Sequence, residues 1–338
     1  MRILFCSVPF APSVGGIETV AALLAAEFAR AGHEVVLVTQ TSSGSPDERP
    51  YRVVRRPGAA ALLRLVREAD CVFHNNISLR LGWPLLFVAR PWVVAHHTRL
   101  PDGGLAVMGK RLAMRLARNV SVSAAMARHL PVPSVQVPNP YRADLFRLLP
   151  EVPRQQDLVF VGRLVSEKGV SLLLHALARL AVRGRAPALT VVGDGPERAS
   201  LERQARDSGL AARVYFAGVL QGDALVRCLN AHRAIVVPSV CDEAFGLVAL
   251  EGLACGCLPI VADSGGLPQA AGPDALVFPK GNVQALARTL ARWQRAQTAP
   301  PRERRAEHLA RHEPRAVAAR YLSILGDGLG NGAGLAAP

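Results

Sequence analysis

The alternation of short apolar runs with longer stretches of helical period limits the fold of this chain more than any other feature of its sequence. In the first 150 residues, apolar runs occupy residues 2–8, 34–40, 70–76, 92–97 and 119–123. Between the first two runs, Val20, Leu24 and Phe28 recur at the spacing of one helical face. Strand, helix and strand in this order are typical of βαβ units. The sequence therefore predicts an α/β fold with parallel sheets.

The same alternation repeats in the second half. Apolar runs occupy residues 157–162, 188–194, 213–219, 234–239, 258–263 and 275–279. A polar, Pro-containing stretch at 147–157 separates the halves. We expect one doubly wound domain at 1–150 and another at 151–325, with the last helix packing back on the first domain and a flexible Gly-rich tail at 326–338. Because such sheets bind ligands at the carboxyl ends of their strands, the site is expected in the cleft between the domains.

The chain is strongly basic, which points to an anionic partner. Its net charge is +14, and residues 1–150 carry 18 Lys and Arg against 9 Asp and Glu. Phosphates, nucleic acid and an acidic membrane surface all fit this balance. The basic residues are scattered, aromatic residues make up only 5% of the chain, and no nucleic-acid-binding motif is found. We therefore expect no nucleic-acid partner.

Two cations follow the first apolar run of the second half. In the stretch FVGRLVSEKGV, Arg163 comes just after the predicted strand and Lys168 just before the next helix. At the carboxyl edge of a sheet, Arg163 can bind a diphosphate through two hydrogen bonds and Lys168 as a point charge. Solvated surface cations are the alternative. Gly193, after the next strand, would border the same nucleotide, although a tight turn alone also explains it.

A pair of glycines, Gly15 and Gly16, separates the first predicted strand from the first helix. Glycines let the backbone approach a ligand closely, and the helix start behind them offers free N–H groups to an anion. A purely structural turn is an equally good explanation. The pair does not form the GxGxxG pattern of dinucleotide-binding proteins, which argues against a dehydrogenase.

Two glutamates lie eight residues apart in the apolar stretch CDEAFGLVALEGLACG. Glu243 precedes a helix that is expected to begin near Gly246, where free N–H groups can also hold an anion. Glu251 lies within that helix among apolar residues, where a carboxylate is costly unless something binds it. The pair can act as general acid and base, or can accept hydrogen bonds from sugar hydroxyls. A helix cap for Glu243 and a core salt bridge for Glu251 are the structural alternatives.

In order, spacing and context these motifs resemble a large family of retaining glycosyltransferases, which includes bacterial α-mannosyltransferases, lipopolysaccharide core glycosyltransferases and sucrose synthase. The resemblance covers most of the chain and is strongest in DLVFVGRLVSEKGVSLLLHAL, LTVVGDGPE and VPSVCDEAFGLVALEGLACGCLPIVADSGGLPQ. It implies the GT-B fold, in which two Rossmann-like domains face each other across a cleft. The C-terminal domain would hold a nucleotide sugar, and the N-terminal domain an acceptor.

The resemblance also implies roles for single residues of the second domain. Arg163 and Lys168 would bind the diphosphate of the donor. Glu243 would bind hydroxyls of the transferred sugar, and Glu251 those of the ribose. Backbone contacts beside sugar and phosphate are implied at Phe245, Gly246 and Leu247.

For the first domain, the resemblance implies that Gly16, next to Gly15, closes over the diphosphate. The family also has a histidine near the sugar after a strand, and of His96 and His97 we favour His96. Two features depart from the family pattern. Ala244 stands where Pro often follows the first glutamate, and the interdomain signature PNGVD appears as PNPYRADLF.

Members of this family keep the anomeric configuration of the donor. The resemblance therefore implies transfer of a hexose from a UDP- or GDP-sugar to a glycan or lipid-linked saccharide, in bacterial polysaccharide or glycolipid synthesis. No carboxylate is placed as a glycosidase-type nucleophile, which favours attack from the face that the diphosphate leaves. The sequence contains no CxxC pair and no Asp-x-Asp metal motif in a suitable loop, so neither a metal nor a cofactor is expected.

Two other functions fit the same fold. A nucleotide-sugar epimerase or hydrolase would act on the donor without an acceptor, and a nucleotide-sugar-binding protein would not turn it over. The sequence leaves the donor sugar, its base, the acceptor and the linkage open.

A basic stretch with interspersed apolar residues makes membrane contact a further expectation. Residues 109–119 contain Lys110, Arg111, Arg115 and Arg118 between Leu112, Met114 and Leu116. Such a helix can lie on anionic lipid, and an ordinary solvated helix face is the alternative. No signal peptide and no apolar segment of bilayer length is apparent, so the sequence predicts a cytoplasmic protein, peripheral on the inner face of the membrane.

Overall fold

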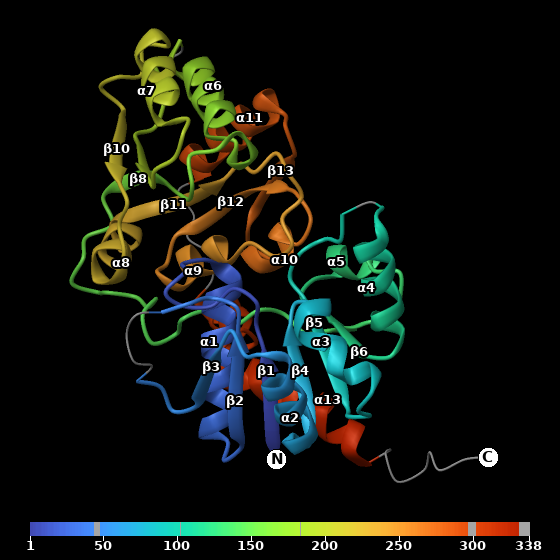
Figure 1. The fold of residues 1–338 in the computed structure, drawn as a ribbon. Helices are drawn as coiled ribbons and strands as arrows, with labels where there is room; N and C mark the ends of the chain where they lie inside the picture. Colours follow the sequence, from blue (N-terminus) through green and yellow to red (C-terminus); the bar gives the residue numbers. More distant parts are fainter. Residues whose placement is uncertain (44–47, 102, 183, 297–301, 331–338) are drawn as a thin grey trace. The chain divides into compact units, whose positions relative to one another are not determined.

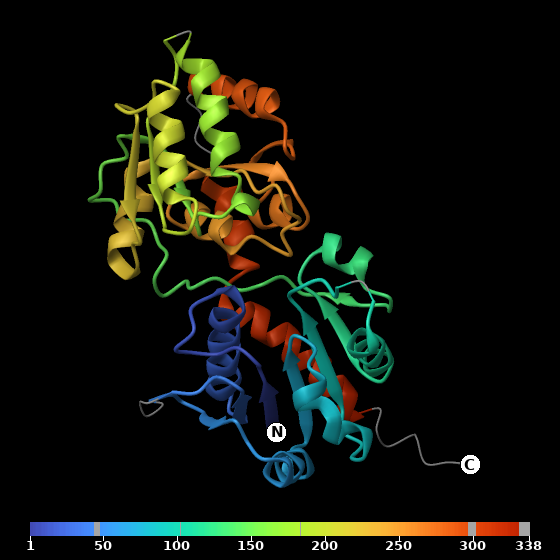
Figure 2. The same cartoon turned by 45° about the horizontal axis from the view of Figure 1, so that its top comes forward.

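The computed structural model describes residues 1–43, 48–101, 103–182, 184–296 and 302–330. The chain divides into two compact units, which Figures 1 and 2 show. Unit 1 comprises Met1–Pro140 and His312–Pro338, and unit 2 comprises Tyr141–Arg311. The chain therefore enters unit 2 at Tyr141, before residue 150, and leaves it at Arg311.

The polar stretch at 147–157, which the sequence placed at the domain boundary, belongs to unit 2 because the side chain of Asn230 binds its backbone and its own Arg154 binds the backbone of Cys255. The side chain of Asn230 accepts a hydrogen bond from Leu149 N (2.8 Å) and donates one to Arg147 O (2.9 Å). The guanidinium of Arg154 donates to the carbonyl oxygen of Cys255 at 2.7 Å. Proline content and polarity alone do not reveal these contacts.

Unit 1 is built on one parallel sheet of seven strands in the order β3-β2-β1-β4-β5-β6-β7. The strands are β1 (Arg2–Cys6), β2 (Glu34–Thr39), β3 (Arg52–Arg55), β4 (Cys71–Asn75), β5 (Trp92–His96), β6 (Arg118–Ser121) and β7 (Val135–Gln136). The helices are α1 (Gly16–Arg30), α2 (Ala59–Glu68), α3 (Leu79–Gly82), η1 (Trp83–Leu86), α4 (Leu105–Arg115), α5 (Ala124–His129) and α13 (Pro314–Gly330). The five strands predicted for this half are confirmed, whereas β3 and β7 were not predicted.

Apolar side chains cover both faces of this sheet. On one face, Phe5 and Phe73 of the central strands stack with Phe28 of α1 and Tyr321 of α13, with ring centroids 4.7 to 6.0 Å apart. On the other face, Leu4, Val72 and Val94 pack with the buried residues of α2. Because each strand is buried on both sides, it reads in the sequence as a continuous apolar run.

The last helix, α13, packs on α1 and β5 of unit 1 (Figure 2). It extends through residues 326–330, which the sequence placed in a flexible tail, so that part of the expectation is wrong. Arg118 donates to Ile324 O (3.0 Å) and lies 3.8 Å from the carboxylate of Asp327. These contacts stabilise the end of a helix that contains several glycines. The remaining tail residues, 331–338, lie outside the described residues.

Unit 2 is built on a parallel sheet of six strands in the order β10-β9-β8-β11-β12-β13. The strands are β8 (Gln156–Val161), β9 (Leu189–Val192), β10 (Val214–Gly218), β11 (His232–Val237), β12 (Leu258–Asp263) and β13 (Leu276–Pro279). The helices are η2 (Ser166–Lys168), α6 (Val170–Ala181), α7 (Arg198–Asp207), α8 (Gly222–Ala231), α9 (Leu247–Ala254), α10 (Leu267–Ala271), α11 (Val283–Ala296) and α12 (Arg302–Ala310). All six predicted strands are confirmed.

Both sheets have the same order of strands when each unit is counted from its own first strand, 3-2-1-4-5-6, with β7 added at the edge of unit 1. The direction of winding reverses between β1 and β4 in unit 1 and between β8 and β11 in unit 2. In open α/β sheets, ligands bind outside the carboxyl ends of the strands at such a switch point. The topology therefore selects one edge of each sheet as the place to look for a site.

At the switch point of unit 2, two loops approach each other closely enough to require glycine. Gly169 has a left-handed φ of +70°, and a Cβ at this position would lie 2.1 Å from the carbonyl oxygen of Pro238. The loop after β8 can therefore lie against the loop after β11 only because residue 169 has no side chain.

We expect Gly169→Ala to destabilise the protein more than Gly209→Ala. Gly209 has the same φ of +70° but nothing within 4 Å of its missing Cβ. Both variants lose about 1 kcal/mol from the left-handed backbone, and Gly169→Ala loses about 1–3 kcal/mol more because the loops must separate. Thermal unfolding of the full chain measures the difference. Equal melting temperatures for the two variants would contradict the close approach.

Candidate functional site

The switch point of the unit 2 sheet brings two of the predicted site residues into contact. Lys168 ends η2, after β8, and Glu243 lies in the loop after β11. Lys168 Nζ lies 2.6 Å from Glu243 Oε1, although 75 positions separate the residues. Only 27% and 17% of these side chains are exposed, so water screens the pair less than a surface ion pair. The sequence indicated both residues but not that they meet.

Residues that the sequence argument missed hold Glu243 in place. Ser239 donates its hydroxyl to Glu243 Oε1 at 2.7 Å. From the loop after β12, Gly266 N donates to Glu243 O at 2.8 Å, and a Cβ on Gly265 would lie 2.0 Å from the same oxygen. The signal for this loop was present as a glycine pair between a strand and a helix, like Gly15–Gly16.

Two helices begin beside the ion pair without a capping side chain. Gly169 precedes α6 and Gly246 precedes α9, and neither helix has an acidic residue in its first turn. The positive ends of both helices are therefore not compensated by a side chain, which suits an anion. The predicted backbone residues Phe245, Gly246 and Leu247 all lie at the start of α9.

Arg163 and Gly193 lie at the same edge of the sheet. The side chain of Arg163, two residues after β8, is exposed and makes no hydrogen bond or ion pair with a described residue. Gly193 follows β9 with a φ of +135°, and a Cβ there would lie 1.9 Å from Gly162 O. The close approach of two backbones therefore explains the glycine at 193 without a ligand. The guanidinium of Arg163, in contrast, has no partner among the described residues and is available to bind one.

Glu251 lies in the second turn of α9 and is half-buried. Burial raises the pKa of its carboxyl group to about 8, and the positive charge of Arg142 opposes part of this rise. The guanidinium of Arg142 itself lies 3.0 Å from the carboxylate of Asp144. No salt bridge to Glu251 is formed among the described residues, so a core ion pair does not account for its position. A carboxyl group that is largely protonated at neutral pH can both donate to and accept from a hydroxyl.

In unit 1, the predicted residues Gly15 and Gly16 lie at the carboxyl edge of the sheet, where Gly16 is the first residue of α1. Gly15 precedes α1 and provides no side-chain cap. The carboxylate of Glu18, in the first turn of α1, lies 2.5 Å from where a Cβ of Gly15 would be. This negative charge occupies the positive end of α1 and competes there with any bound anion.

The two candidate histidines occupy different environments at the same edge of unit 1. His96 is the last residue of β5, and its Nε2 lies 2.9 Å from Asn119 Oδ1. His97 is the first residue after the strand, and neither of its ring nitrogens has a hydrogen-bond partner among the described residues. Burial lowers the pKa of both rings, that of His97 to about 3, so both are neutral at physiological pH. The side chain of Asn139 lies close to the His97 ring and offsets part of the lowering of its pKa, but neither ring nitrogen is held as directly as Nε2 of His96 is by Asn119.

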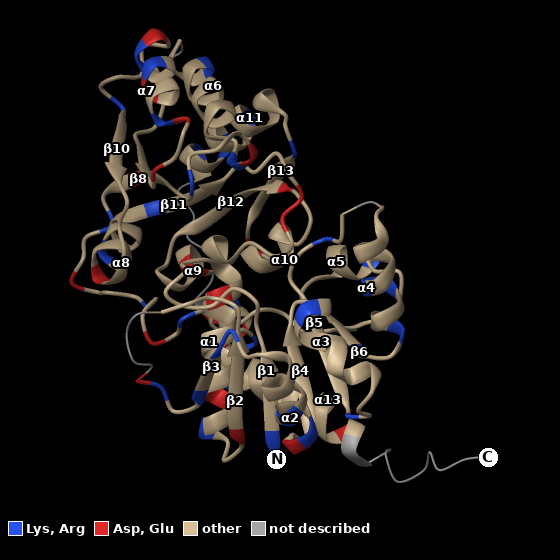
Figure 3. Ribbon diagram, viewed as in Figure 1, with Lys and Arg blue, Asp and Glu red and all other residues tan. Residues whose placement is uncertain are grey.

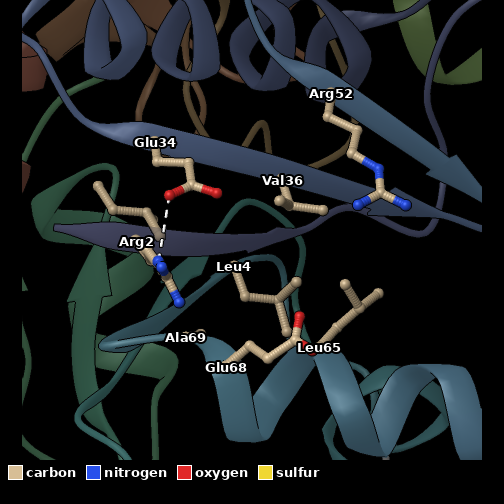
Figure 4. A pocket seen from close by; sticks show the side chains of 9 residues that line it. Arg2, Leu4, Glu34, Val36, Arg52, Leu65, Glu68 and Ala69 are labelled. Atoms are coloured by element: carbon tan, nitrogen blue, oxygen red, sulfur yellow. Dashed lines mark hydrogen bonds and ion pairs between the residues drawn. The ribbon is translucent and has the colours of Figure 1, made fainter.

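A separate pocket lies at the opposite edge of the unit 1 sheet. Figure 4 shows it at the amino ends of the strands, where Arg2 and Glu34 form an ion pair at 3.2 Å across its rim. Because ligands of such sheets bind at the carboxyl ends, this pocket is not the candidate site. In the described part of the chain, no group of three or more His, Cys, Asp and Glu residues could hold a metal ion. Nor does that part contain a helix long and apolar enough to cross a bilayer.

Two parallel α/β units with the same strand order, and a charged site at the carboxyl strand ends, are typical of proteins that bind phosphorylated ligands. Comparison with known proteins identifies the family. Residues 143–311 match the family model described as "Glycosyl transferases group 1", and residues 14–132 match "Glycosyltransferase Family 4". The chain belongs to the glycosyl transferases of group 1. The structure of HepE from Anabaena in complex with UDP is 18% identical and has a TM-score of 0.78, over 97% of this chain and 100% of that one. The predicted GT-B class of fold, with two parallel α/β domains, is thus confirmed.

Two relatives show how the similarity is distributed along the chain. A 2-deoxystreptamine glucosyltransferase from Streptomyces kanamyceticus is 38% identical over 136 residues, which are 39% of this chain and 35% of the relative. A GDP-mannose-dependent alpha-(1-6)-phosphatidylinositol dimannoside mannosyltransferase from Mycobacterium tuberculosis is 26% identical over 331 residues, 85% of this chain and 86% of the relative. The first match therefore spans only about a third of the glucosyltransferase.

We expect Glu251→Gln to stabilise the protein at high pH. The pKa of Glu251 is about 8 in the folded chain and ordinarily 4.5, so its protonated form stabilises the fold at low pH and this contribution is lost as the pH rises through 8. Glutamine stays neutral. The melting temperature of the variant should exceed that of the wild type by about 3 °C or more at pH 9, with the gap closing toward pH 4.5. A gap that does not change with pH would contradict the assigned pKa.

Proposed function

We propose that the chain is a retaining glycosyltransferase that moves a hexose from a UDP- or GDP-sugar to a glycan or lipid-linked saccharide, in bacterial polysaccharide or glycolipid synthesis. The observation that carries this proposal is the Lys168–Glu243 pair at the switch point of unit 2, beside the uncapped starts of α6 and α9. A nucleoside diphosphate sugar places two negative charges next to a ring of hydroxyls. The charges match Lys168 and the two helix starts, and the hydroxyls match the carboxylate of Glu243. The family, the GDP-mannose-dependent mannosyltransferase from Mycobacterium tuberculosis and the structure of HepE with UDP support the same class of donor.

In this proposal the charge of the departing diphosphate is balanced by groups of the protein. Arg163 supplies a full positive charge, Lys168 adds a charge that it shares with Glu243, and a helix start contributes about half a charge. Arg163 is exposed and makes no ion pair with a described residue, so it can turn toward a phosphate without breaking a contact in the described fold. We infer that no divalent cation and no further cofactor takes part.

Retention is assigned to attack from the face that the diphosphate leaves. Glu243 Oε1 accepts hydrogen bonds from both Lys168 and Ser239, which weakens its carboxylate as a nucleophile. In the proposed step, the acceptor oxygen bonds to the anomeric carbon as the bond to the phosphate oxygen breaks, and the leaving phosphate takes the hydroxyl proton. Glu243 then holds hydroxyls of the transferred sugar, and Glu251 those of the ribose.

We assign the acceptor to the carboxyl edge of the unit 1 sheet. The neutral, unpartnered imidazole of His97 can exchange hydrogen bonds with sugar hydroxyls there, whereas Nε2 of His96 is already engaged by Asn119. Gly15 and Gly16 adjoin the same edge. We further propose that the protein works at the cytoplasmic face of a membrane, with an anionic lipid surface as its partner.

A panel of UDP- and GDP-sugars tests the donor assignment. One of them should raise the free energy of unfolding by about 2.7 kcal/mol at 100 times its dissociation constant. With that donor and a saccharide acceptor, Lys168→Ala and Glu243→Ala should lower turnover by two orders of magnitude or more while the fold persists. Release of free hexose or an epimer without any acceptor would identify the hydrolase or epimerase instead.

The matched control is Arg233→Ala. The guanidinium of Arg233 lies 3.8 Å from the carboxylate of Asp157, between the same two strands as the Lys168–Glu243 pair but at their amino ends. This variant should turn over donor at the rate of the wild type. If Arg233→Ala and Lys168→Ala lose activity equally, the site is not at the carboxyl edge.

Substitutions of the two histidines should differ in their effects: that of His97 on transfer activity and that of His96 on stability. We expect His97→Ala to lower transfer by about 10- to 100-fold with little change in stabilisation by the donor nucleotide, because only hydrogen bonds to the acceptor side are lost. His96→Ala should mainly lower the melting temperature, because it leaves the buried Oδ1 of Asn119 without its partner. Normal transfer by the His97 variant together with lost transfer by a folded His96 variant would restore the assignment made from the sequence.

A further inference from the structure

Unit 1 exposes an unusual concentration of large apolar side chains. Six of the 14 large apolar residues that are exposed in the described chain come from one segment, Leu86, Phe87, Leu105, Met108, Leu112 and Leu116. Their exposed fractions range from 60% to 85%. Single exposed apolar residues are ordinary, but a group of this size on neighbouring elements marks a surface that binds something. We call these six residues the apolar face.

Four members of the apolar face lie on α4 or at its end, and the way this helix packs on unit 1 explains why they are exposed. Val107, Ala113 and Met114 are buried in the core of unit 1, which turns the opposite side of the helix outward. Met108 and Leu112 therefore lie four residues apart on the outer side, in line with Leu105 and Leu116. Met114, which the sequence groups with Leu112 and Leu116 in the basic stretch, is fully buried and does not belong to this outer side.

The segment that carries the apolar face is strongly cationic. Residues 71–135 contain eight Lys and Arg but one acidic residue, Asp102. The helix α4 carries Lys110, Arg111 and Arg115 and no acidic residue (Figure 3), with Arg111 and Arg115 exposed and Lys110 half-buried. Long cationic side chains beside exposed Leu and Met are the composition of helices that lie in the headgroup region of anionic membranes.

An arginine-lined groove continues this surface at the amino ends of β5 and β6. Its charged lining residues are Arg67, Arg90, Arg115 and Arg118 against Glu68 and Asp70, so that arginines outnumber acids, and Leu116 of the apolar face also lines it. The Nε of Arg90 is buried without a hydrogen-bond partner among the described residues. Arg118 is already bound to Asp327, and Arg90 donates to Arg67 O. Arg67 and Arg115 form no ion pair with a described residue and can bind the phosphate of a lipid headgroup next to the inserted side chains.

We propose that the apolar face and the arginine groove form one docking surface for an anionic lipid bilayer. Leu105, Met108 and Leu112 would enter the headgroup region, with the cations around them on lipid phosphates. A second copy of the chain is a poorer occupant, because a symmetric contact would place the same cations opposite each other. The proposal rests on the membrane partner named under the proposed function and identifies the surface that meets it.

The direction of α4 relates this surface to the acceptor edge of unit 1. The helix begins on the carboxyl side of the sheet, to which His97 also belongs, and ends at the amino end of β6. A bilayer on the docking surface therefore reaches from the arginine groove to the side of the sheet assigned to the acceptor. An acceptor anchored in that bilayer would be presented beside His97, not at the opposite edge.

Co-sedimentation of the full chain with lipid vesicles tests the docking surface. The wild type should bind phosphatidylcholine vesicles that contain phosphatidylglycerol, bind pure phosphatidylcholine far less, and be released between about 0.1 M and about 1 M salt. The variant K110Q/R111Q/R115Q should lose about 100-fold in partitioning, at roughly fivefold for each cation. Its control, R288Q/R292Q/R295Q, removes three exposed arginines of α11 in unit 2 and should bind like the wild type.

A second pair of variants tests how much the exposed apolar side chains contribute to vesicle binding. Phe87→Ser with Leu112→Ser should lower binding by about tenfold or more, whereas Val182→Ser with Val277→Ser, which changes exposed residues of unit 2, should not. Equal losses for the two triple variants would overturn the proposal in favour of unspecific attraction by net charge. So would self-association of the wild type that the Phe87 and Leu112 changes abolish. Stabilisation by a donor nucleotide should be unchanged in all four variants, so a wild type that binds vesicles but no nucleotide sugar would refute the proposed function alone.

Discussion

Parallel strand pairing in a fixed order is the constraint on which the rest of this molecule depends. Every crossover returns the chain to the same edge, so all strands of a sheet end together, and the loops that follow them converge. In unit 2 the order places β8 beside β11, which brings the loop of Lys168 to the loop of Glu243. Gly169 allows the two loops to touch. The electrostatics of the site thus follow from hydrogen bonds between strands that lie far from its charged atoms.

Several polar groups at these edges destabilise the fold and are best understood through binding. The carboxyl group of Glu251 is buried enough to raise its pKa to about 8, yet it forms no salt bridge among the described residues. The imidazole of His97 is buried with neither nitrogen paired in the same part of the chain. Ordinary packing would replace such groups by apolar ones of similar size. Their presence at carboxyl strand ends supports a ligand rich in hydroxyl groups.

Most of the fold could be predicted from the sequence because buried parallel strands appear as apolar runs between helices. The strand β3 escaped prediction because its run RVVR is short and bounded by charges, and β7 because it has only two residues. The site residues were indicated one at a time, but the contact of Lys168 with Glu243 depends on which strands are neighbours, and local sequence does not encode that order. The choice between His96 and His97 depends on where β5 ends, which a sequence pattern gives only to within a residue or two.

The two helix starts nearest the switch points differ in a way that bears on the division of labour between the units. Gly15 and Gly246 precede α1 and α9 without a side-chain cap, so both helices offer their N–H groups. In α1, however, the carboxylate of Glu18 already occupies the positive end, whereas the first turn of α9 has no acid and lies in the loop that carries Glu243, the partner of Lys168. A diphosphate would meet repulsion at the first helix and attraction at the second. Within the proposed function, electrostatics therefore favour unit 2 for the charged leaving group and leave unit 1, with its neutral histidines, for an uncharged saccharide.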